Sequence, residues 1–428
     1  MHTELAAEFI GTPEGEKAKE VIANCVHCGF CNATCPTYQL LGDELDGPRG
    51  RIYLMKQMFE GKDVSDITQQ HLDRCLTCRA CETTCPSGVK YSELVEVGRR
   101  VMERKTNRSA AERAKRWGLK EMVARPAVFK RASAVGYSLK PMLPDSVKAL
   151  LPNRPDAGRG LPAGRHNRTM LVLEGCVQPS LTPQTNAAAA RVLDALGINL
   201  KSVPQAGCCG AVRHHMNDLE GAKVDARRNI DAWWPYIESS QAEAIVSTAS
   251  GCGVQIEHYA TLMADEPEYA EKAAKISNLS KDISLVVQEE LLAIEANAVP
   301  QAKQPLKVAV QDPCSFQHAL VNKGTVGPLL SRFGHKPVPV RDGHLCCGSA
   351  GTYSVLQPEI SKQLRTRKIE SLEISSPDLI VTANVGCYGH LSAESKTPIK
   401  HWIEVVDDVL HENGVRAIAQ AAQEPAHA

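Results

Sequence analysis

Residues 25–36 read Cys-Val-His-Cys-Gly-Phe-Cys-Asn-Ala-Thr-Cys-Pro, and residues 75–86 read Cys-Leu-Thr-Cys-Arg-Ala-Cys-Glu-Thr-Thr-Cys-Pro. Both stretches separate their four cysteines by two, two and three residues and end in proline. Bacterial proteins use this spacing to hold [4Fe–4S] clusters, with three thiolates from one run and the fourth from the other. The two stretches therefore predict two clusters and a fold built around them.

The spacing also predicts which cysteines share a cluster. We expect the first cluster on Cys25, Cys28, Cys31 and Cys85, and the second on Cys75, Cys78, Cys81 and Cys35. Pro36 and Pro86 end the local turn and direct the fourth thiolate away from its own triplet. Two such clusters in one chain predict that electrons pass through it, and we expect no catalytic residue in the chain itself.

Disulfides and zinc are weaker interpretations of these cysteines. The first ten residues have neither a basic segment nor an apolar core typical of a signal peptide, so we expect a reducing, cytoplasmic location. Structural zinc usually takes Cys-x2-Cys pairs separated by a loop, and not two four-cysteine runs that end in proline.

The composition predicts a multidomain protein that does not cross a membrane. A chain of 428 residues with 43% apolar side chains can form about three domains, each with a core. We find no stretch of 18 apolar residues. The net charge is zero, but residues 104–168 contain 16 Lys/Arg and only 4 Asp/Glu, together with six prolines.

This basic, Pro-rich segment has two interpretations. It is either a solvated linker or a partly helical arm that contacts an anionic bilayer surface or an acidic partner. The second interpretation predicts a peripheral position on the cytoplasmic face of the inner membrane. Nucleic acid is not an expected partner, because no aromatic platform or recognition motif accompanies the charge.

The remaining eight cysteines form two matching sets. They are Cys176, Cys208, Cys209 and Cys252, followed by Cys314, Cys346, Cys347 and Cys387. Cys176 to Cys208 and Cys314 to Cys346 have the same separation, and each set contains Cys-Cys-Gly. This regularity predicts a duplicated domain.

Each repeat alternates short apolar strands with helices, as in an α/β fold. We expect strands near 170–173, 244–248, 307–310 and 379–382, and helices near 186–196 and 358–372. A helix near 217–234 is expected to break at Pro235. The first and last cysteine of each repeat follow strand ends, where ligands of open α/β sheets gather. Three interpretations stay open for these thiols: a further iron–sulfur cluster, zinc, or a redox disulfide.

Longer motifs resemble a known family. Residues 25–31, 42–51, 229–235, 344–353 and 401–404 resemble the iron–sulfur subunits of bacterial glycolate oxidase (glycolate dehydrogenase). These subunits are similar in turn to the wider cysteine-rich domain family, which includes heterodisulfide reductase subunits and lactate-utilisation proteins. The resemblance covers nearly the whole chain.

The resemblance implies an α+β and α/β multidomain protein. Its parts are a two-cluster α-helical ferredoxin over 1–103, a basic linker or arm over 104–168, and cysteine-rich domains over 169–300 and 301–428. A helix over 48–59 suits the helical ferredoxin, because proline often begins a helix.

The resemblance also implies electron transfer from glycolate, or from D-lactate, by way of FAD on partner subunits. The acceptor would be a quinone or another membrane acceptor. We find no G-x-G-x-x-G motif after a strand and no P-loop lysine, so we do not expect this chain to hold the flavin or a nucleotide. The same architecture could serve a lactate or glycerol-3-phosphate dehydrogenase.

One departure separates the chain from heterodisulfide reductases, whose repeats end in Cys-x-x-Cys. Gln255 and His390 stand where the fifth cysteine of each repeat would be. This difference disfavours thiol–disulfide chemistry but leaves four thiols per repeat. His390 is either a replacement ligand or, more simply, a neighbouring histidine without that role, and His214, His215, His318 and His344 are weaker candidates of the same kind.

Overall fold

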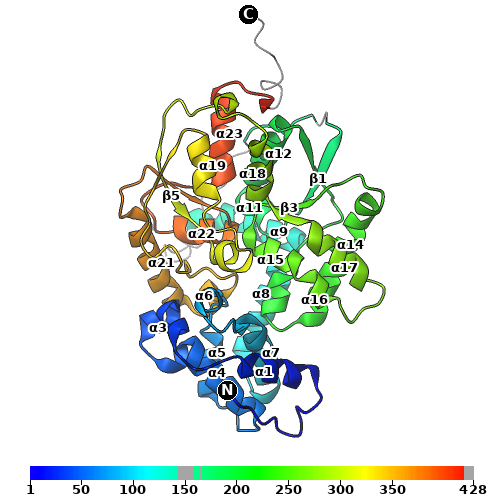
Figure 1. The fold of residues 1–428 in the computed structure, drawn as a ribbon, viewed down its shortest axis with the longest axis vertical. Helices are drawn as coiled ribbons and strands as arrows, with labels where there is room; N and C mark the ends of the chain where they lie inside the picture. Colours follow the sequence, from blue (N-terminus) through cyan, green and yellow to red (C-terminus); the bar gives the residue numbers. More distant parts are fainter. Residues whose placement is uncertain (143–157, 164–165, 419–428) are drawn as a thin grey trace, which may run out of the picture.

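The computed structural model describes residues 1–142, 158–163 and 166–418. A helical N-terminal region lies at one end of the molecule, and two α/β units lie side by side above it (Figure 1). Residues 143–157, 164–165 and 419–428, which belong to the predicted arm and the predicted last domain, lie outside the described residues.

The N-terminal region is built from helices, and the described residues 1–142 contain no strand. Its elements are α1 (Pro13–Ala23), α2 (Phe30–Ala33), α3 (Pro36–Leu41), η1 (Glu44–Asp46), α4 (Pro48–Phe59), α5 (Asp66–Asp73), α6 (Ala80–Thr84) and α7 (Tyr91–Lys105). Proline begins α1, α3 and α4, where its missing N–H has no helical partner to lose. The prediction of a helical ferredoxin is therefore confirmed.

A small apolar core holds these helices together. Ile22, Met55, Phe59 and Leu94 are buried where α1, α4 and α7 meet. Gly98 lets α7 lie directly against α4, since a Cβ there would be 2.4 Å from the sulfur of Met55. This packing fixes the helix ends that carry the first eight cysteines.

Two parallel four-stranded sheets follow in the described part of the chain. The first has the order β2-β1-β3-β4 and the second β6-β5-β7-β8. The strands are β1 (Arg168–Val172), β2 (Ile198–Ser202), β3 (Ile245–Ser247), β4 (Ser280–Asp282), β5 (Lys307–Gln311), β6 (Lys336–Val338), β7 (Leu379–Thr382) and β8 (Ile399–His401). Since the strand order is the same in both sheets, the prediction of two α/β repeats is confirmed.

Helices cover both sheets. The first repeat has α11 (Gln178–Leu181), α12 (Pro183–Ala195), α13 (Ala211–His215), α14 (Leu219–Glu238), α15 (Ser250–Glu257), α16 (Tyr259–Leu262), α17 (Ala270–Leu279), α18 (Ile283–Leu292) and η3 (Ala296–Ala298). The second has the π-helical turn η4 (Ser315–Ala319), α19 (Val326–Arg332), α20 (Tyr353–Leu356), α21 (Pro358–Glu373), α22 (Val385–Ser392) and α23 (Trp402–Glu412).

One helix end differs from its prediction. Pro235 does not break α14, which continues to Glu238. Proline there leaves the carbonyl of Asp231 without its helical N–H partner. Both residues lie on the exposed side of the last turn, where water can take that hydrogen bond. The expected break was therefore wrong.

The two repeats share one core. Buried side chains of α12 and α18 from the first repeat pack with those of α19 and α23 from the second. Trp402, at the start of α23, is fully buried in this core. Arg191 and Asp407 join α12 to α23 at 2.7 Å, so α23, the last helix of the described residues, contacts both repeats.

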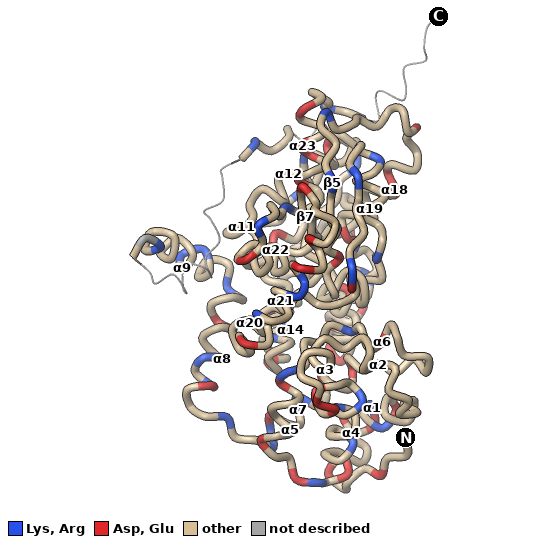
Figure 2. The backbone as a smooth tube through the Cα atoms, turned by 90° about the vertical axis from the view of Figure 1, so that its left-hand side faces the viewer, with Lys and Arg blue, Asp and Glu red and all other residues tan. Residues whose placement is uncertain are grey.

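The basic segment forms two helices, α8 (Ala110–Val123) and α9 (Pro126–Leu139), followed by η2 (Lys140–Met142). Helix α8 is braced on both sides, because Arg116 pairs with Asp73 of α5 and Lys120 pairs with Asp218 before α14. Helix α9 extends from the side of the molecule, with basic residues along it (Figure 2). Among the described residues, no helix is both long and apolar enough to cross a membrane.

Candidate iron–sulfur sites

The first four-cysteine group lines a cavity at the surface of the N-terminal region. Cys25, Cys28, Cys31 and Cys85 all line it, and it holds about 430 Å³ of empty space, part of it open to solvent. Cys25 follows α1, Cys31 lies in α2, and Cys85 follows α6. The structure thus brings the last cysteine of the second run beside the first three of the first run.

The second group lines an adjoining cavity of about 310 Å³. Its cysteines are Cys35, Cys75, Cys78 and Cys81. Cys81 lines both cavities, so the two cysteine groups lie next to each other. The donor set is sulfur alone in each case, which suits iron–sulfur clusters. The assignment of individual ligands stays a prediction.

Matching turns shape the two cysteine loops. His27 and Gly29 in the first loop, and Thr77 and Arg79 in the second, all have left-handed backbone conformations. Glycine at position 29 leaves room for Arg49, since a Cβ there would lie 2.6 Å from Nη1 of Arg49, whereas the second loop carries the side chain of Arg79 in the same conformation. In the second loop the N–H of Thr77 donates to Sγ of Cys75 at 3.4 Å. Such turns present backbone donors to negatively charged sulfur.

A buried arginine supplies positive charge beside the second cavity. Arg51 is 1% exposed, donates from Nη1 to Sγ of Cys35 at 4.0 Å, and pairs with Asp46 at 3.3 Å. Burial by itself raises the pKa of the Cys75 thiol, but Arg51 and Arg99 outweigh it and hold that pKa below its usual value. Burial raises the pKa of Cys78 well above its usual range.

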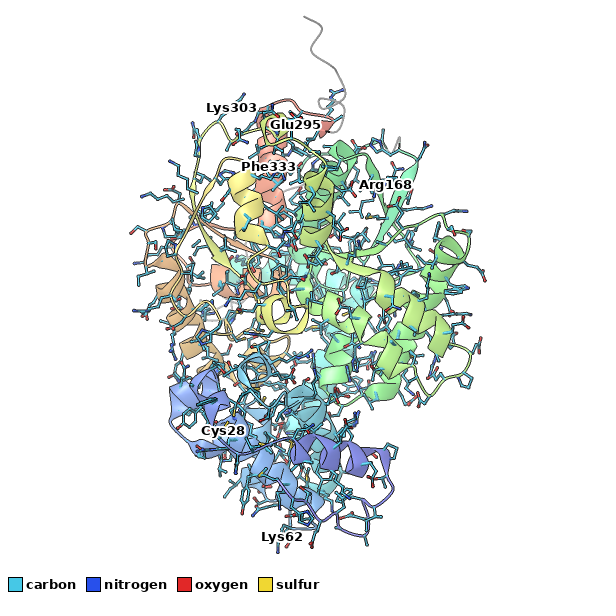
Figure 3. The ribbon with its side chains drawn as sticks, in the orientation of Figure 1. Cys28, Lys62, Arg168, Glu295, Lys303 and Phe333 are labelled. Atoms are coloured by element: carbon cyan, nitrogen blue, oxygen red, sulfur yellow. The ribbon has the colours of Figure 1, made fainter. Side chains whose placement is uncertain are left out.

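The surroundings of the first cavity are more open. Cys28 is exposed, and it is labelled on the N-terminal region in Figure 3. Its neighbours Val26 and Phe30 are also exposed, at 69% and 62%. Exposed apolar side chains beside a cysteine site are typical of a surface that another protein covers.

The four thiols of the second repeat form one connected group. Cys314 lies 3.7 Å from Cys346, and Cys347 lies 3.3 Å from Cys387, measured between sulfur atoms. A thiol hydrogen bond between Cys346 and Cys347 joins the two pairs. The sequence prediction that the four thiols converge at the strand ends therefore agrees with their positions.

The first repeat has the same arrangement. Thiol hydrogen bonds run from Cys176 to Cys208, between Cys208 and Cys209, and between Cys209 and Cys252. The hydrogen bonds that Cys208 accepts from Cys176 and Cys209 lower its pKa well below the usual value.

The backbone conformation explains why each Cys-Cys turn is followed by glycine. Gly210 and Gly348 have φ values of +89° and +90°, and each donates its N–H to the first cysteine of the turn. A Cβ on Gly348 would lie 2.6 Å from the carbonyl oxygen of Ser361. Only glycine fits this turn without strain.

The two repeats contact different parts of the molecule. Cys314 and Cys346 pack together with Cys78 and Leu76 of the N-terminal region, and Tyr353 donates to the carbonyl of Arg74 at 2.9 Å. By contrast, Cys176 and Cys208 of the first repeat pack against the end of α8. The second repeat therefore lies directly against the second cavity.

Known proteins match the whole of this architecture. A family model described as a 4Fe-4S dicluster domain matches residues 21–89, and one described as a cysteine-rich domain matches 170–257 and 308–392. The glycolate oxidase iron-sulfur subunit of Escherichia coli (strain K12) is 50% identical over 96% of this chain and 99% of its own length. The chain belongs to the family of glycolate oxidase iron–sulfur subunits.

Other relatives agree with this family. The probable glycolate oxidase iron-sulfur subunit of Bacillus subtilis (strain 168) is 31% identical over 90% of this chain and 92% of its own length. Lactate utilization protein A of Exiguobacterium is 25% identical, over 54% of this chain and 94% of its own length. A crystal structure of a hypothetical protein from Helicobacter pylori has the same fold, with a TM-score of 0.53, 10% identity, and coverage of 98% of this chain and 74% of that one.

Within this family, the N-terminal region is a [4Fe–4S] dicluster domain, and the prediction of two such clusters agrees with the matched model. Each cluster, when bound, supplies one-electron chemistry. The residues of the chain would hold each cluster through these cysteines, and Arg51 lies beside the second group.

His390 is not directed at the thiols as a free ligand. Its Nε2 lies 3.2 Å from Oγ of Ser361, and Ser361 donates to the carbonyl of Gly348. Burial lowers the pKa of His390 to about 4, so the ring is neutral near neutral pH. His390 therefore supports the Cys-Cys-Gly turn through Ser361.

The other histidines near the cysteines join separate parts of the fold. His214 pairs with Glu96 of α7 at 2.9 Å. His318 contacts Thr83 of α6 at 3.0 Å and the carbonyl of His344 at 3.0 Å. His215 stacks on His214.

The sequence reasoning missed the buried charges at these sites. Arg51, Lys368 and the Glu96–His214 pair were not singled out, although each is close to a cysteine group or joins two units. A basic residue at an otherwise apolar helical position, as at Lys368 between Leu364 and Leu372, was the available signal.

Proposed function

We propose that this chain is the electron-transferring iron–sulfur subunit of a glycolate oxidase (glycolate dehydrogenase) complex. A flavin on partner subunits would oxidise glycolate to glyoxylate, or D-lactate to pyruvate. Electrons would then pass through this chain toward a quinone or another membrane acceptor. The relatives' names support the substrate, and the two adjoining four-cysteine cavities carry the electron-transfer role.

We assign the ligands of the two clusters from the cavity linings. Cys25, Cys28, Cys31 and Cys85 would hold the first, and Cys35, Cys75, Cys78 and Cys81 the second. Because the cavities adjoin at Cys81, one electron can move between them over a short distance. Arg51 and the N–H of Thr77 would stabilise negative charge on the second group.

We extend the assignment to the repeats, where each set of four thiols would hold a further iron–sulfur cluster. Zinc is the competing occupant, because four thiolates also suit a structural zinc site. A dithiol–disulfide pair is the other candidate, favoured by the 3.3 Å separation between the sulfurs of Cys347 and Cys387. Metal analysis separates the three.

The domain bounds belong to the same proposal. We divide the chain into a two-cluster domain over 1–103, an arm over 104–168, and cysteine-rich domains over 169–300 and 301–428. The exposed surface at Val26, Cys28 and Phe30 is where the flavin-bearing partner would approach the first cluster. Helix α9, with exposed Val135 and Leu139 and its basic residues, would touch an anionic bilayer surface on the cytoplasmic side.

The deciding experiment counts iron, acid-labile sulfide and zinc per chain in complex purified without oxygen. Two filled clusters give about eight iron atoms, and filled repeats raise the count further. About eight iron atoms with added zinc would assign the repeats to zinc. An iron-free protein would contradict the electron-transfer proposal. If lactate but not glycolate reduced the flavin of the complex, the substrate would be lactate instead.

A further inference from the structure

One cation is buried at the cysteine group of the second repeat. Lys368, on α21, is 2% exposed. Its ammonium donates to the carbonyl of Gly343 at 2.9 Å and, in the described part of the chain, forms no ion pair with a carboxylate. An ammonium has three hydrogens to donate, and a buried charge without a counter-charge is costly.

The groups that favour its charged form are the thiols. Lys368 lies one helical turn beyond Leu364, which is in contact with Gly348 of the Cys-Cys-Gly turn, and its neighbour Ile369 packs with Cys347 and Cys387. Burial lowers the pKa of Lys368 below its usual value, and the opposing effects of Cys347, Cys346, Cys387 and Asp312 do not cancel it. Four neutral thiols would leave the ammonium unpaired. A negatively charged metal–thiolate group at these cysteines would pair it, so the buried lysine itself indicates an anion at this site.

The first repeat has no such charge at the matching position. Around Gly210 the close neighbours are Ala222 and Asp225, and around Gly348 they are Ser361 and Leu364, each 139 positions after its counterpart in the first repeat. By this spacing, Asn229 of the first repeat occupies the position equivalent to Lys368 of the second.

The side chain of Asn229 is neutral, and both its amide nitrogen and its amide oxygen have hydrogen-bond partners. It is 0% exposed and donates to the carbonyl of Cys208 at 2.8 Å and to the hydroxyl of Tyr259 at 2.9 Å. Arg228 beside it donates to the carbonyl of Cys208 at 2.9 Å, but it is partly exposed and its charge is already paired with Asp225 at 2.8 Å. The two repeats thus hold their four thiols in matching geometry but with different buried charge.

We propose that Lys368 is a positioning residue whose fixed positive charge raises the reduction potential of the cluster at the second repeat above that of the first. This inference rests on the proposed function, because it requires a cluster at Cys314, Cys346, Cys347 and Cys387. A reduced cluster carries one more negative charge than the oxidised one, and a nearby ammonium stabilises that extra charge.

The position of the second repeat gives this charge a role in electron flow. Cys346 packs in the same group as Cys78, which lines the second cavity. A cluster held by the cysteines of that cavity would lose one electron, a cluster at the second repeat would gain it, and no bond would be made or broken. Lys368 supplies the compensating charge in advance, so the transfer needs no proton.

The test is a redox titration of the intact complex, followed by electron paramagnetic resonance. Cys347→Ser identifies the signal of the second repeat by its loss. In Lys368→Met we expect the equilibrium constant for reduction of that cluster to fall at least tenfold. The midpoint potential of its signal then falls by at least about 59 mV, the equivalent for a one-electron couple. Lys368→Arg, which keeps the charge, should stay close to the unsubstituted protein.

Lys362→Met is the matched control, since Lys362 is exposed on the same helix. If the methionine variant does not assemble, Lys368→Gln provides the neutral side chain with an amide like that of Asn229. An unmoved midpoint in the neutral variant, with the signal present, overturns the role of Lys368 alone. The absence of any signal lost in Cys347→Ser overturns the cluster assignment of the repeat as well.

Discussion

Nε2 of His214 lies 2.9 Å from Oε1 of Glu96, and this pair joins α13 of the first repeat to α7 of the dicluster domain. His214 is buried and also contacts Oε1 of Gln255 at 3.1 Å, and Arg100 reaches the same oxygen of Glu96 at 3.0 Å. The ring of His258 stacks on His214 from the other side. A charged pair in this place couples the docking of two units to pH.

The first prediction follows from the titration of this pair. Burial lowers the pKa of His214, but Glu96 outweighs it and holds that pKa above the usual 6.5. The same pairing holds the pKa of Glu96 down, at about 2 against its usual 4.5. The pair therefore contributes its full stabilisation between pH 4.5 and pH 6.5, the usual pKa values of the two groups. This contribution is lost as pH rises through the raised pKa of His214.

We expect His214→Gln to lower the unfolding free energy by about 1 kcal/mol near pH 5.5 and by much less near pH 9. Thermal unfolding of the anaerobic protein at both pH values measures the difference. The exposed pair His2–Glu4 supplies the control His2→Gln, which should change nothing. An equal loss at both pH values would assign the effect of His214 to packing instead.

The second prediction concerns the exposed cysteine of the first cavity. Cys28→Ser should remove about four iron atoms per chain and one cluster signal. Acceptor reduction should stop, while the partner flavin is still reduced by glycolate. Ile67→Ser introduces the same side chain at an exposed apolar residue of α5, outside the cavity linings, and should leave both intact. Acceptor reduction that continues in Cys28→Ser would defeat the proposed electron route.

The third prediction concerns the buried arginine. Arg51→Met removes the donor to Cys35 and one of three partners of Asp46, which also pairs with His71 and Arg74, and we expect it to cost about 1–3 kcal/mol and to release the second cluster. Arg49→Met breaks a partly exposed pair with Glu44 and should cost about 1 kcal/mol or less. Equal iron content and stability in the two variants would contradict a special role for Arg51.

The fourth prediction compares glycines of the second repeat. Gly348→Ala puts a methyl group on a left-handed backbone position and against the carbonyl oxygen of Ser361. We expect the second repeat to lose its metal and the unfolding free energy to fall by about 2 kcal/mol or more. Gly343→Ala has open space around its new Cβ and should be nearly neutral. Metal analysis of both variants decides, and full metal content in Gly348→Ala would show that the turn can relax.

The fifth prediction concerns α9. Lys130 and Arg131 are exposed and have no ion pair among the described residues, whereas Arg116 and Lys120 of α8 are used to brace the fold. The double variant Lys130→Glu/Arg131→Glu should bind less to vesicles that contain anionic lipid, with a difference that fades at high salt.

The control for this experiment places the same charge change far from α9. Lys62→Glu/Lys303→Glu changes two exposed lysines at opposite ends of the molecule (Figure 3). Vesicle sedimentation should show no difference for this control. Equal binding of all three proteins would leave α9 without a membrane role.

Local patterns predicted much of this fold. Helix α4 begins and ends as expected, because proline at position 48 suits a first helical turn, and β7 matches its predicted range. The repeated cysteine spacing predicted two equivalent sheets. Pro235 was misjudged, because a proline in an exposed last turn loses only one hydrogen bond and water can replace it.

The cysteine spacing also predicted the two cavities, because the cysteines expected to share a cluster line the same cavity. The pairing of Glu96 with His214 and the position of Lys368 beside the thiols could not be predicted in this way. Both depend on how separate helices pack, and packing between distant segments leaves no period in the sequence. The bracing of α8 by Asp73 and Asp218 was missed for the same reason.

The core shared by α12 and α23 has a consequence for biosynthesis. The first repeat is synthesised long before Trp402 and Asp407, yet one face of its helix α12 is covered only when these residues arrive. During translation the first repeat therefore exposes an apolar face, while the N-terminal helices already have a core of their own.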